Sequence, residues 1–509
     1  MSRTTTVLKL PADRPRISSL IFFILGCLAT TTFAPLGWHL LIPILLLPLL
    51  YVCLTLSPRN AARYGFWFGF GWFLTGTYWI YISVVVFGQA PLWIALILMF
   101  GLVLIMSAYL ALAVWLISHL SAGEPWLLLA VAPAAWVLVE WLRGWLFTGF
   151  PWLALGYSQI DSPLAGWAPV IGVYGVSLVL MLSVAAMLLA IMTRGRQQWV
   201  TIGIVVLPWV AGGILRAVDW TQPAATPVAV TLLQGGVSQD QKWLPAQLQP
   251  TLDYYREQSL RAPAGAIVVW PEVAIPAVTD RVEDYLDLLE VDSQVSGRTI
   301  VFGILERVYM PHDEVKIYNS VLAFDGTRRQ VYRKRHLVPF GEYFPVPAQV
   351  REWMRMLNLP HSDLTAGEAE QPLLVAANGV RLAVAICYED AYGAEQLYAL
   401  PDANMLVNVS NDAWFGDSIA PHQHLQIARM RALEVGRPAV RATNTGISGF
   451  IGPHGEIFDT GAQFQPVSLS ATLVPRTGST PYVVTGNWLV VAYCVLLITL
   501  FLIRAKTRR

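Results

Sequence analysis

Hydrophobic residues are spread very unevenly along this 509-residue chain. Long apolar runs fill its N-terminal part and return at its C-terminal end, whereas the segment between them mixes charged, proline and glycine residues with short apolar runs. A transmembrane helix needs about 20 mostly apolar residues. The pattern therefore predicts eight membrane spans, at 17–34, 38–56, 64–87, 91–118, 127–147, 165–193, 198–215 and 484–503.

The same pattern divides the chain into three segments. Residues 1–219 hold seven predicted transmembrane helices, residues 220–483 form a polar domain, and residues 484–509 hold the eighth helix and a short tail. Nothing resembling the small-residue cleavage site of a signal peptide follows the first apolar run. We therefore expect that run to be retained as a membrane anchor.

Positive charge in the short polar stretches predicts how these helices are oriented. Lysine and arginine occur before the first span, after the second and sixth spans, and after the last: Arg3, Lys9, Arg14, Arg16, Arg59, Arg63, Arg194, Arg196, Arg504, Lys506, Arg508 and Arg509. With eight spans all of them lie on one side, and positive loops stay in the cytoplasm. Both termini are then cytoplasmic and the polar domain faces outward, which in a bacterial inner membrane is the periplasm.

Composition agrees with a membrane protein. Hydrophobic residues make up 55% of the chain and charged residues only 13%, whereas about a quarter of residues are charged in an average soluble protein. The formal net charge of +1 gives no indication of nucleic-acid binding, which usually shows as a strongly basic patch or domain.

The polar domain alternates short β-branched runs with amphipathic stretches, which is typical of a layered α/β fold. We expect helices at 246–261, 281–295 and 422–435. Several predicted strands end directly in polar residues, and α/β folds place their sites at such ends. The predicted strands are PVAVTLLQ, AIVVWPE, TIVFGILE, NSVLAFD, RLAVAIC, NMLVNVSND, AVRATN and SLSATLVP.

Three strand ends carry side chains that could take part in catalysis. Glu272 follows AIVVWP, Lys334 lies in YRKRHLVPFGE, and Cys387 ends RLAVAIC, whereas the other three cysteines lie inside long apolar runs. Each residue alone has a structural alternative: Glu272 could cap a helix, Lys334 could be one of several solvated bases, and Cys387 could be a buried core residue. Together they suggest more. A thiol with a pKa of about 8.5 is a weak nucleophile until a base or cation activates it, and a glutamate with a lysine could do so in acyl transfer.

These motifs also carry a resemblance. WPE at 270–272, the run from Tyr332 to Glu342 and CYE at 387–389 resemble the Glu-Lys-Cys motifs of the nitrilase (carbon–nitrogen hydrolase) superfamily. With eight spans around them, nearly the whole chain resembles the bacterial apolipoprotein N-acyltransferase family. The resemblance implies an α-helical membrane bundle of eight spans plus an α/β nitrilase-like αββα sandwich domain.

The resemblance also implies residue roles. Glu272 would be the general base, Lys334 the residue that stabilises the oxyanion, and Cys387 the nucleophile. Among the supporting residues, Glu342 would assist the lysine, Tyr388 and Glu389 would shape the site, Trp243 in QKW would be a loop aromatic near the entrance, and Asn319 in YNS would be a polar position of the same motif set.

The implied reaction is the final step of lipoprotein maturation. Cys387 would take an acyl chain from a phospholipid, with phosphatidylethanolamine as the expected donor, and form a thioester. The α-amino group of the N-terminal diacylglyceryl-cysteine of an apolipoprotein would then accept the chain. No cofactor is implied. We expect no metal site either, because His422 and His424 are two residues apart on a predicted helix and do not share a face.

Several alternatives stay open at this point. The chain could be a membrane-tethered amidase or nitrilase that hydrolyses a small amide, or a transporter or lipid-binding scaffold with an inactive polar domain. Glu140 and Arg143, three residues apart in a predicted span, could form an ion pair that anchors a helix end or could shape a site for a polar headgroup. The segment 412–418 could be a lid or an ordinary surface loop.

Overall fold

The structure is a computed structural model that describes residues 15–88, 91–224, 226–311, 315–343 and 364–507. The chain divides into two compact units. The first contains the described residues up to Val85, those from 91 to Val218, and those from Val484 onward. The second consists of Asp219–Val483 together with a few residues after Val85.

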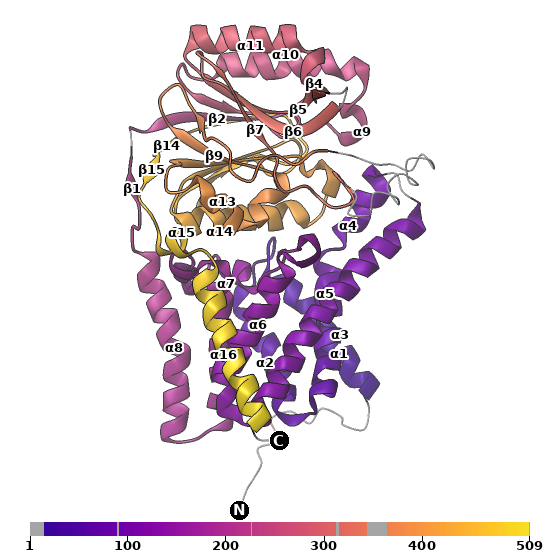
Figure 1. Cartoon of the computed structure of the whole chain (residues 1–509), viewed down its shortest axis with the longest axis vertical. Coiled ribbons are helices and arrows are strands. Elements are labelled where there is room, and N and C mark those ends of the chain that lie inside the picture. Colours follow the sequence, from indigo (N-terminus) through magenta and orange to yellow (C-terminus); the bar gives the residue numbers. More distant parts are fainter. Residues whose placement is uncertain (1–14, 89–90, 225, 312–314, 344–363, 508–509) are drawn as a thin grey trace, which may run out of the picture. The chain divides into compact units, whose positions relative to one another are not determined.

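The first unit is helical (Figure 1). Among the described residues, five helices are long and apolar enough to cross a membrane, and a sixth span is formed if two helices bent by 48° are counted as one. The two N-terminal apolar helices are shorter. Apolar helices are thus confirmed, whereas the count of eight spans is not. The helices are α1 Pro15–Ala29, α2 Ile42–Thr55, α3 Pro58–Gly76, α4 Trp79–Ile82, α5 Leu92–Ser121, α6 Leu128–Arg143, α7 Ala168–Met192, α8 Arg196–Arg216 and α16 Trp488–Thr507.

Glu140 and Arg143 form a buried ion pair on α6, with 3.9 Å between Oε1 and Nη2. Glu140 Oε1 also accepts a hydrogen bond from the backbone N of Leu155 at 2.7 Å. Arg143 Nη1 donates to the carbonyl oxygens of Phe150 and Trp152 at 2.8 and 2.6 Å. The pair therefore holds the chain that follows α6, which favours the structural alternative.

The second unit contains two large β-sheets (Figure 1). One has the strand order β14-β2-β3-β5-β6-β7, with β4 beside β5, and the other has the order β13-β12-β11-β10-β9-β8. The strands are β2 Val228–Gln234, β3 Ile267–Val269, β4 Ile275–Val278, β5 Thr299–Tyr309, β6 Val315–Phe324, β7 Arg329–Arg333, β8 Leu374–Val375, β9 Arg381–Ile386, β10 Met405–Ser410, β11 Ala439–Thr443, β12 Gly449–Ile451, β13 Ile457–Thr460 and β14 Val467–Leu473, and β1 Gln222–Pro223 pairs separately with β15 Arg476–Thr477.

Alternating side chains along the strands build a four-layer αββα sandwich, because successive residues of a strand point to opposite faces. Ile267 and Val269 face inward and pack with Val384 and Val407 of the other sheet. Val268, between them, packs in a separate cluster with residues of the outer helices. The outer helices are α10 Pro245–Arg261 and α11 Glu283–Ser296 on one face of the sandwich and α14 Ala420–Val435 on the other. The unit also contains three shorter helices, α9 Gln239–Lys242, α13 Gly393–Gln396 and α15 Pro481–Thr485.

Trp270 anchors the end of β3 to α10. Its ring is fully buried and stacks on Tyr255 at 4.9 Å, and its Nε1 donates to Ser259 Oγ at 2.9 Å. We expect Trp270→Ala to lower the free energy of unfolding by about 3–5 kcal/mol. Trp270→Phe keeps an aromatic ring and should cost less. Thermal unfolding of the detergent-purified chain should rank wild type above W270F and W270F above W270A; equal midpoints would refute this packing role.

Candidate active site

The three residues predicted at strand ends all lie at strand ends in the structure. Glu272 follows β3, Lys334 comes directly after β7, and Cys387 comes directly after β9. The first two belong to one sheet and the third to the other sheet. All three are buried, with exposed fractions of 6%, 1% and 8%.

The Glu272 carboxylate lies at the centre of a buried polar cluster. Its Oε1 is 3.5 Å from Lys334 Nζ and accepts a hydrogen bond from Asn319 Nδ2 at 2.7 Å. Its Oε2 accepts from the backbone N of Asn411 at 2.8 Å. The side chain is thus oriented by three donors from three different segments, which leaves it little rotational freedom.

Lys334 is held between two carboxylates. Its Nζ lies 2.8 Å from Glu342 Oε1, and Asn319 Nδ2 donates to the same oxygen at 3.0 Å. Burial lowers the pKa of Lys334, but the charges of Glu342 and Glu272 outweigh this and raise the pKa above its ordinary value. The lysine is therefore a permanently positive group, as stabilisation of an oxyanion requires.

Cys387 has an unusual backbone conformation and a protonated thiol. Its φ of 53° lies in the left-handed region, which is disfavoured for a residue with a side chain. Burial and the charge of Glu272 raise the pKa of the thiol, although Lys334 and a hydrogen bond with Ser410 act in the opposite direction. The thiol form is thereby favoured over the thiolate. A nucleophilic role for this sulfur would require a base to take its proton, and Glu272 is the carboxylate whose charge acts most strongly on it.

Glu389 connects the lysine segment to the cysteine segment. Its Oε1 accepts from the backbone N of Arg335 at 2.7 Å, and its Oε2 accepts from the backbone N of Ile386 at 2.7 Å. The Tyr332 hydroxyl donates to the same buried carboxylate. Glu389 therefore fixes the end of β7 against the end of β9, which is how two sheets present Lys334 and Cys387 together.

The remaining predicted residues have more peripheral surroundings. The Tyr388 ring is partly buried and meets the Tyr392 ring edge to face at 5.1 Å, and Tyr392 in turn stacks on His336 at 3.6 Å. Trp243, at the end of α9, is 49% exposed. The structure thus brings Glu342, Asn319 and Glu389 into the cluster, and leaves the Trp243 side chain at the surface.

Lys242, the middle residue of the motif QKW, is a further candidate for the site that the sequence did not indicate. It is only 4% exposed, and its Nζ donates to the carbonyl oxygen of Glu272 at 3.3 Å. Burial lowers its pKa to about 8, against the opposing charge of Glu272. A lysine beside an aromatic residue on a short polar helix gives no sign in the sequence that it is buried.

Gly303 on β5 allows the segment of Glu272 to approach. A Cβ at this position would lie 2.5 Å from Val273 N and 2.7 Å from Glu272 Cα, closer than real Cβ atoms come. Gly303→Ala should therefore displace the segment of Glu272 and slow the reaction expected for this site by about 10²-fold, the cost of a misplacement near 1 Å. In the control Gly461→Ala, the nearest atom is 3.4 Å away. Single-turnover rates of both variants test this. A wild-type rate for G303A would contradict the requirement for Glu272 to keep its observed position.

The structure also bears on metal binding. Among the residues that it describes, no group of three or more histidine, cysteine, aspartate or glutamate side chains is arranged to hold a metal ion. His424 lies instead between the carboxylates of Asp390 and Asp412.

Comparison with known proteins identifies the family. Residues 25–186 match the apolipoprotein N-acyltransferase N-terminal domain, and residues 230–482 match the carbon–nitrogen hydrolase domain. The apolipoprotein N-acyltransferase of Nitrosomonas europaea is 42% identical over 483 residues, covering 94% of this chain and 95% of its own. The corresponding protein of Methylococcus capsulatus is 40% identical over 478 residues, covering 92% of each chain.

Among solved structures, an amidase of the nitrilase superfamily from Nesterenkonia covers 51% of this chain and 95% of its own, with 17% identity and a TM-score of 0.37. The assignment depends on the domain matches and on the full-length relatives alone. The N-terminal match is to a domain of apolipoprotein N-acyltransferases, the C-terminal match is to the broader carbon–nitrogen hydrolase domain, and the relatives extend over nearly the whole chain. The chain belongs to the apolipoprotein N-acyltransferase family.

Proposed function

We propose that this membrane protein transfers an acyl chain from a phospholipid to the N-terminus of a lipoprotein, with Cys387 as nucleophile, Glu272 as general base and Lys334 as the cation that stabilises the oxyanion. The activity is the one for which its relatives are named. The residue roles are supported by one observation, the buried cluster of Glu272, Lys334 and Cys387. Glu272 and Lys334 are 3.5 Å apart, and the charges of both act on the Cys387 thiol.

The first half-reaction forms a thioester. Cys387 Sγ attacks the ester carbonyl carbon of the phospholipid while Glu272 accepts the thiol proton. The carbonyl oxygen becomes an oxyanion that the Lys334 ammonium stabilises. When the intermediate collapses, the bond to the glycerol oxygen breaks, Glu272 returns the proton to that oxygen, and a lysophospholipid leaves.

The second half-reaction transfers the chain to an amine. The neutral α-amino group of the diacylglyceryl-cysteine attacks the thioester carbonyl, and Lys334 again faces the oxyanion. Glu272 accepts the proton that the attacking amine loses, and as the C–S bond breaks it passes this proton to the departing Cys387 sulfur, which restores the thiol. Division into two steps suits the chemistry, because a thioester is a good acyl donor to an amine.

The finer features follow from sequence and family together. We place the protein in the bacterial inner membrane with eight spans, divided at residues 219/220 and 483/484, and with the catalytic domain in the periplasm. Phosphatidylethanolamine is the proposed donor and a diacylated apolipoprotein the acceptor. Trp243, exposed directly after α9 and next to the buried Lys242, is proposed to contact a lipid chain rather than the reacting atoms.

The proposed donor makes a testable prediction. The purified full-length chain, mixed with a diacylated lipopeptide, should yield triacylated peptide and one lysophospholipid per product. The rate should be higher with phosphatidylethanolamine than with phosphatidylglycerol of the same acyl chains. Equal rates would remove the headgroup preference. Hydrolysis of small soluble amides without any lipopeptide acylation would instead identify a membrane-tethered amidase.

A further inference from the structure

The left-handed backbone of Cys387 has to be held in place. A non-glycine residue in this region costs about 1–2 kcal/mol, and it persists only where its surroundings impose it. Two buried side chains contact the carbonyl oxygen of Cys387. Asn408 Nδ2 on β10 donates to it at 3.3 Å, and His424 Nε2 on α14 lies 3.1 Å from it.

His424 is itself fixed by two carboxylates. Its Nε2 lies 2.9 Å from Asp390 Oδ1, and its Nδ1 lies 3.1 Å from Asp412 Oδ1. The imidazole and both carboxylates are at most 2% exposed. The single N–H on Nε2 thus faces two acceptors, Asp390 Oδ1 and the Cys387 carbonyl oxygen, while Arg441 Nη2 lies 2.7 Å from Nδ1.

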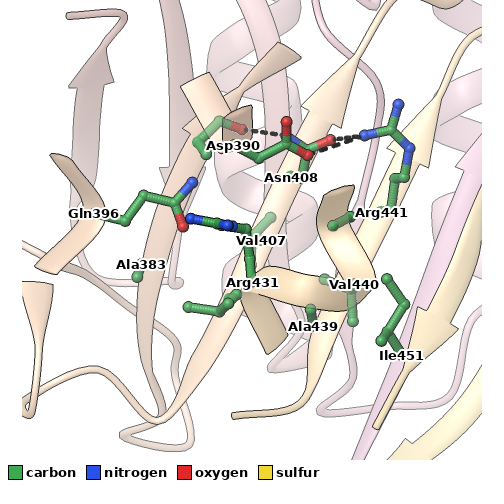
Figure 2. Close-up of a pocket in the computed structure, with 13 residues that line it drawn as sticks. Ala383, Asp390, Gln396, Val407, Asn408, Arg431, Ala439, Val440, Arg441 and Ile451 are labelled. Atoms are coloured by element: carbon green, nitrogen blue, oxygen red, sulfur yellow. Dashed lines mark hydrogen bonds and ion pairs between the residues drawn. The ribbon is translucent and has the colours of Figure 1, made fainter. Parts of the chain in front are cut away.

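Arg441 completes the group, and Figure 2 shows its guanidinium directed at Asp390 and Asn408. Arg441 Nη2 donates to Asp412 Oδ2 at 2.8 Å. Two aspartates and one arginine carry a net charge of −1, which a protonated His424 neutralises. Burial and Arg441 lower the pKa of His424, but Asp390 and Asp412 outweigh them and raise it to about 9.

The network reaches the nucleophile from a second direction. Ser410 Oγ donates to Asp412 Oδ1 at 2.8 Å and also hydrogen-bonds the Cys387 thiol. A cavity of about 20 Å³, enough for one water molecule, is lined by Asp390, Asn408 and Arg441 among others (Figure 2). Burying so many charged groups is costly unless they are well paired, and packed apolar residues often serve stability equally well.

We propose that His424, held between Asp390 and Asp412, is a positioning residue for the catalytic thiol: by donating from Nε2 to the carbonyl oxygen of Cys387 it keeps that residue in the left-handed conformation needed for attack. The inference rests on the proposed role of Cys387 as nucleophile. His424 does not touch the reacting atoms in this role, so its loss should slow acylation of Cys387 without weakening donor binding.

The first test is His424→Phe, which keeps a flat ring but removes both ring nitrogens. Acyl-enzyme formation with phosphatidylethanolamine, followed by intact mass at a temperature well below each unfolding midpoint, should slow by about 10²-fold. The KM for the donor should stay within about twofold, since binding is not affected. His422→Phe, two residues earlier on the same helix and half-buried, is the matched control and should keep the wild-type rate.

Two double variants separate positioning from charge balance. His424→Gln with Asp390→Asn restores neutrality and supplies an amide donor, whereas His424→Phe with Asp390→Asn restores neutrality alone. Both remove the uncompensated charge, so both are expected to fold even if H424F does not. We expect H424Q/D390N to form the acyl-enzyme at least tenfold faster than H424F. We expect H424F/D390N to be no faster than H424F.

The outcomes decide between the claims. Equal recovery in both double variants, or a wild-type rate for H424F, would overturn the positioning role while leaving Cys387 as nucleophile. A wild-type protein that forms no adduct on Cys387 would instead overturn the proposed function. A fall in the unfolding midpoint with an unchanged rate would make His424 a purely structural residue, which also contradicts the proposal.

Discussion

Lys334→Met should slow acyl-enzyme formation by about 10²–10³-fold, the usual cost of losing one oxyanion-stabilising group. It should also destabilise the catalytic unit by about 3–5 kcal/mol, because Glu272 and Glu342 would remain buried without their cation. Lys334 is only 1% exposed and lies 2.8 and 3.5 Å from the two carboxylates, so solvent cannot replace it. Single-turnover rates and thermal unfolding of the purified variant measure the two effects.

A double variant separates these two effects. Lys334→Met combined with Glu342→Gln removes one of the two stranded charges and should recover much of the lost stability. The acylation rate should not recover, because no cation faces the oxyanion in either variant. If the double variant regained activity along with stability, Lys334 would be a structural counter-charge and its catalytic role would be wrong.

Cys387→Ala should abolish both acyl-enzyme formation and lipopeptide acylation. The alanine removes only one buried sulfur atom, so the fold should survive and the unfolding midpoint should change little. The lipopeptide product, detected by mass spectrometry after long incubation, reports the loss. Residual acylation at a substantial fraction of the wild-type rate would show that the acyl chain does not pass through this residue.

Cys387→Ser is a sharper test of the activation mechanism. Burial and the charge of Glu272 raise the pKa of the thiol, so the proposed mechanism has Glu272 take its proton during attack. A serine hydroxyl is much harder to deprotonate than a thiol, and the variant should be inactive or very slow. Normal turnover by C387S would mean that formation of a thiolate is not the step on which the site depends.

Much of the catalytic domain could be predicted from the sequence. The eight predicted strands and three predicted helices of residues 220–483 all occur, because their apolar periodicity is strong and turn residues bound them. Short strands such as β4, β8 and β12 were not predicted, since two to four residues carry too little periodicity. In the membrane part, apolar length alone predicted eight spans, yet α3 and α4 form a bent pair and the first two helices are short.

The site was predictable where a motif ends a strand and not where contacts cross between sheets. Glu272 and Cys387 could be singled out because each follows an apolar run, and Lys334 because it lies in the motif YRKRHLVPFGE. The connection that Glu389 makes between β7 and β9 depends on which strand ends face each other, and no single stretch of sequence contains that information. Lys242 and His424 were missed as site residues for the same reason, because their burial comes from distant segments.

The central claim is that one sulfur carries the acyl chain between two lipids. Intact and peptide-level mass spectrometry of the full-length protein, incubated with phosphatidylethanolamine of defined acyl chains, tests it most directly. We expect the added mass of a single acyl chain, located on Cys387, which disappears when the diacylated lipopeptide is added and triacylated product forms. Product that accumulates without this adduct, or an adduct on another residue, would contradict the claim.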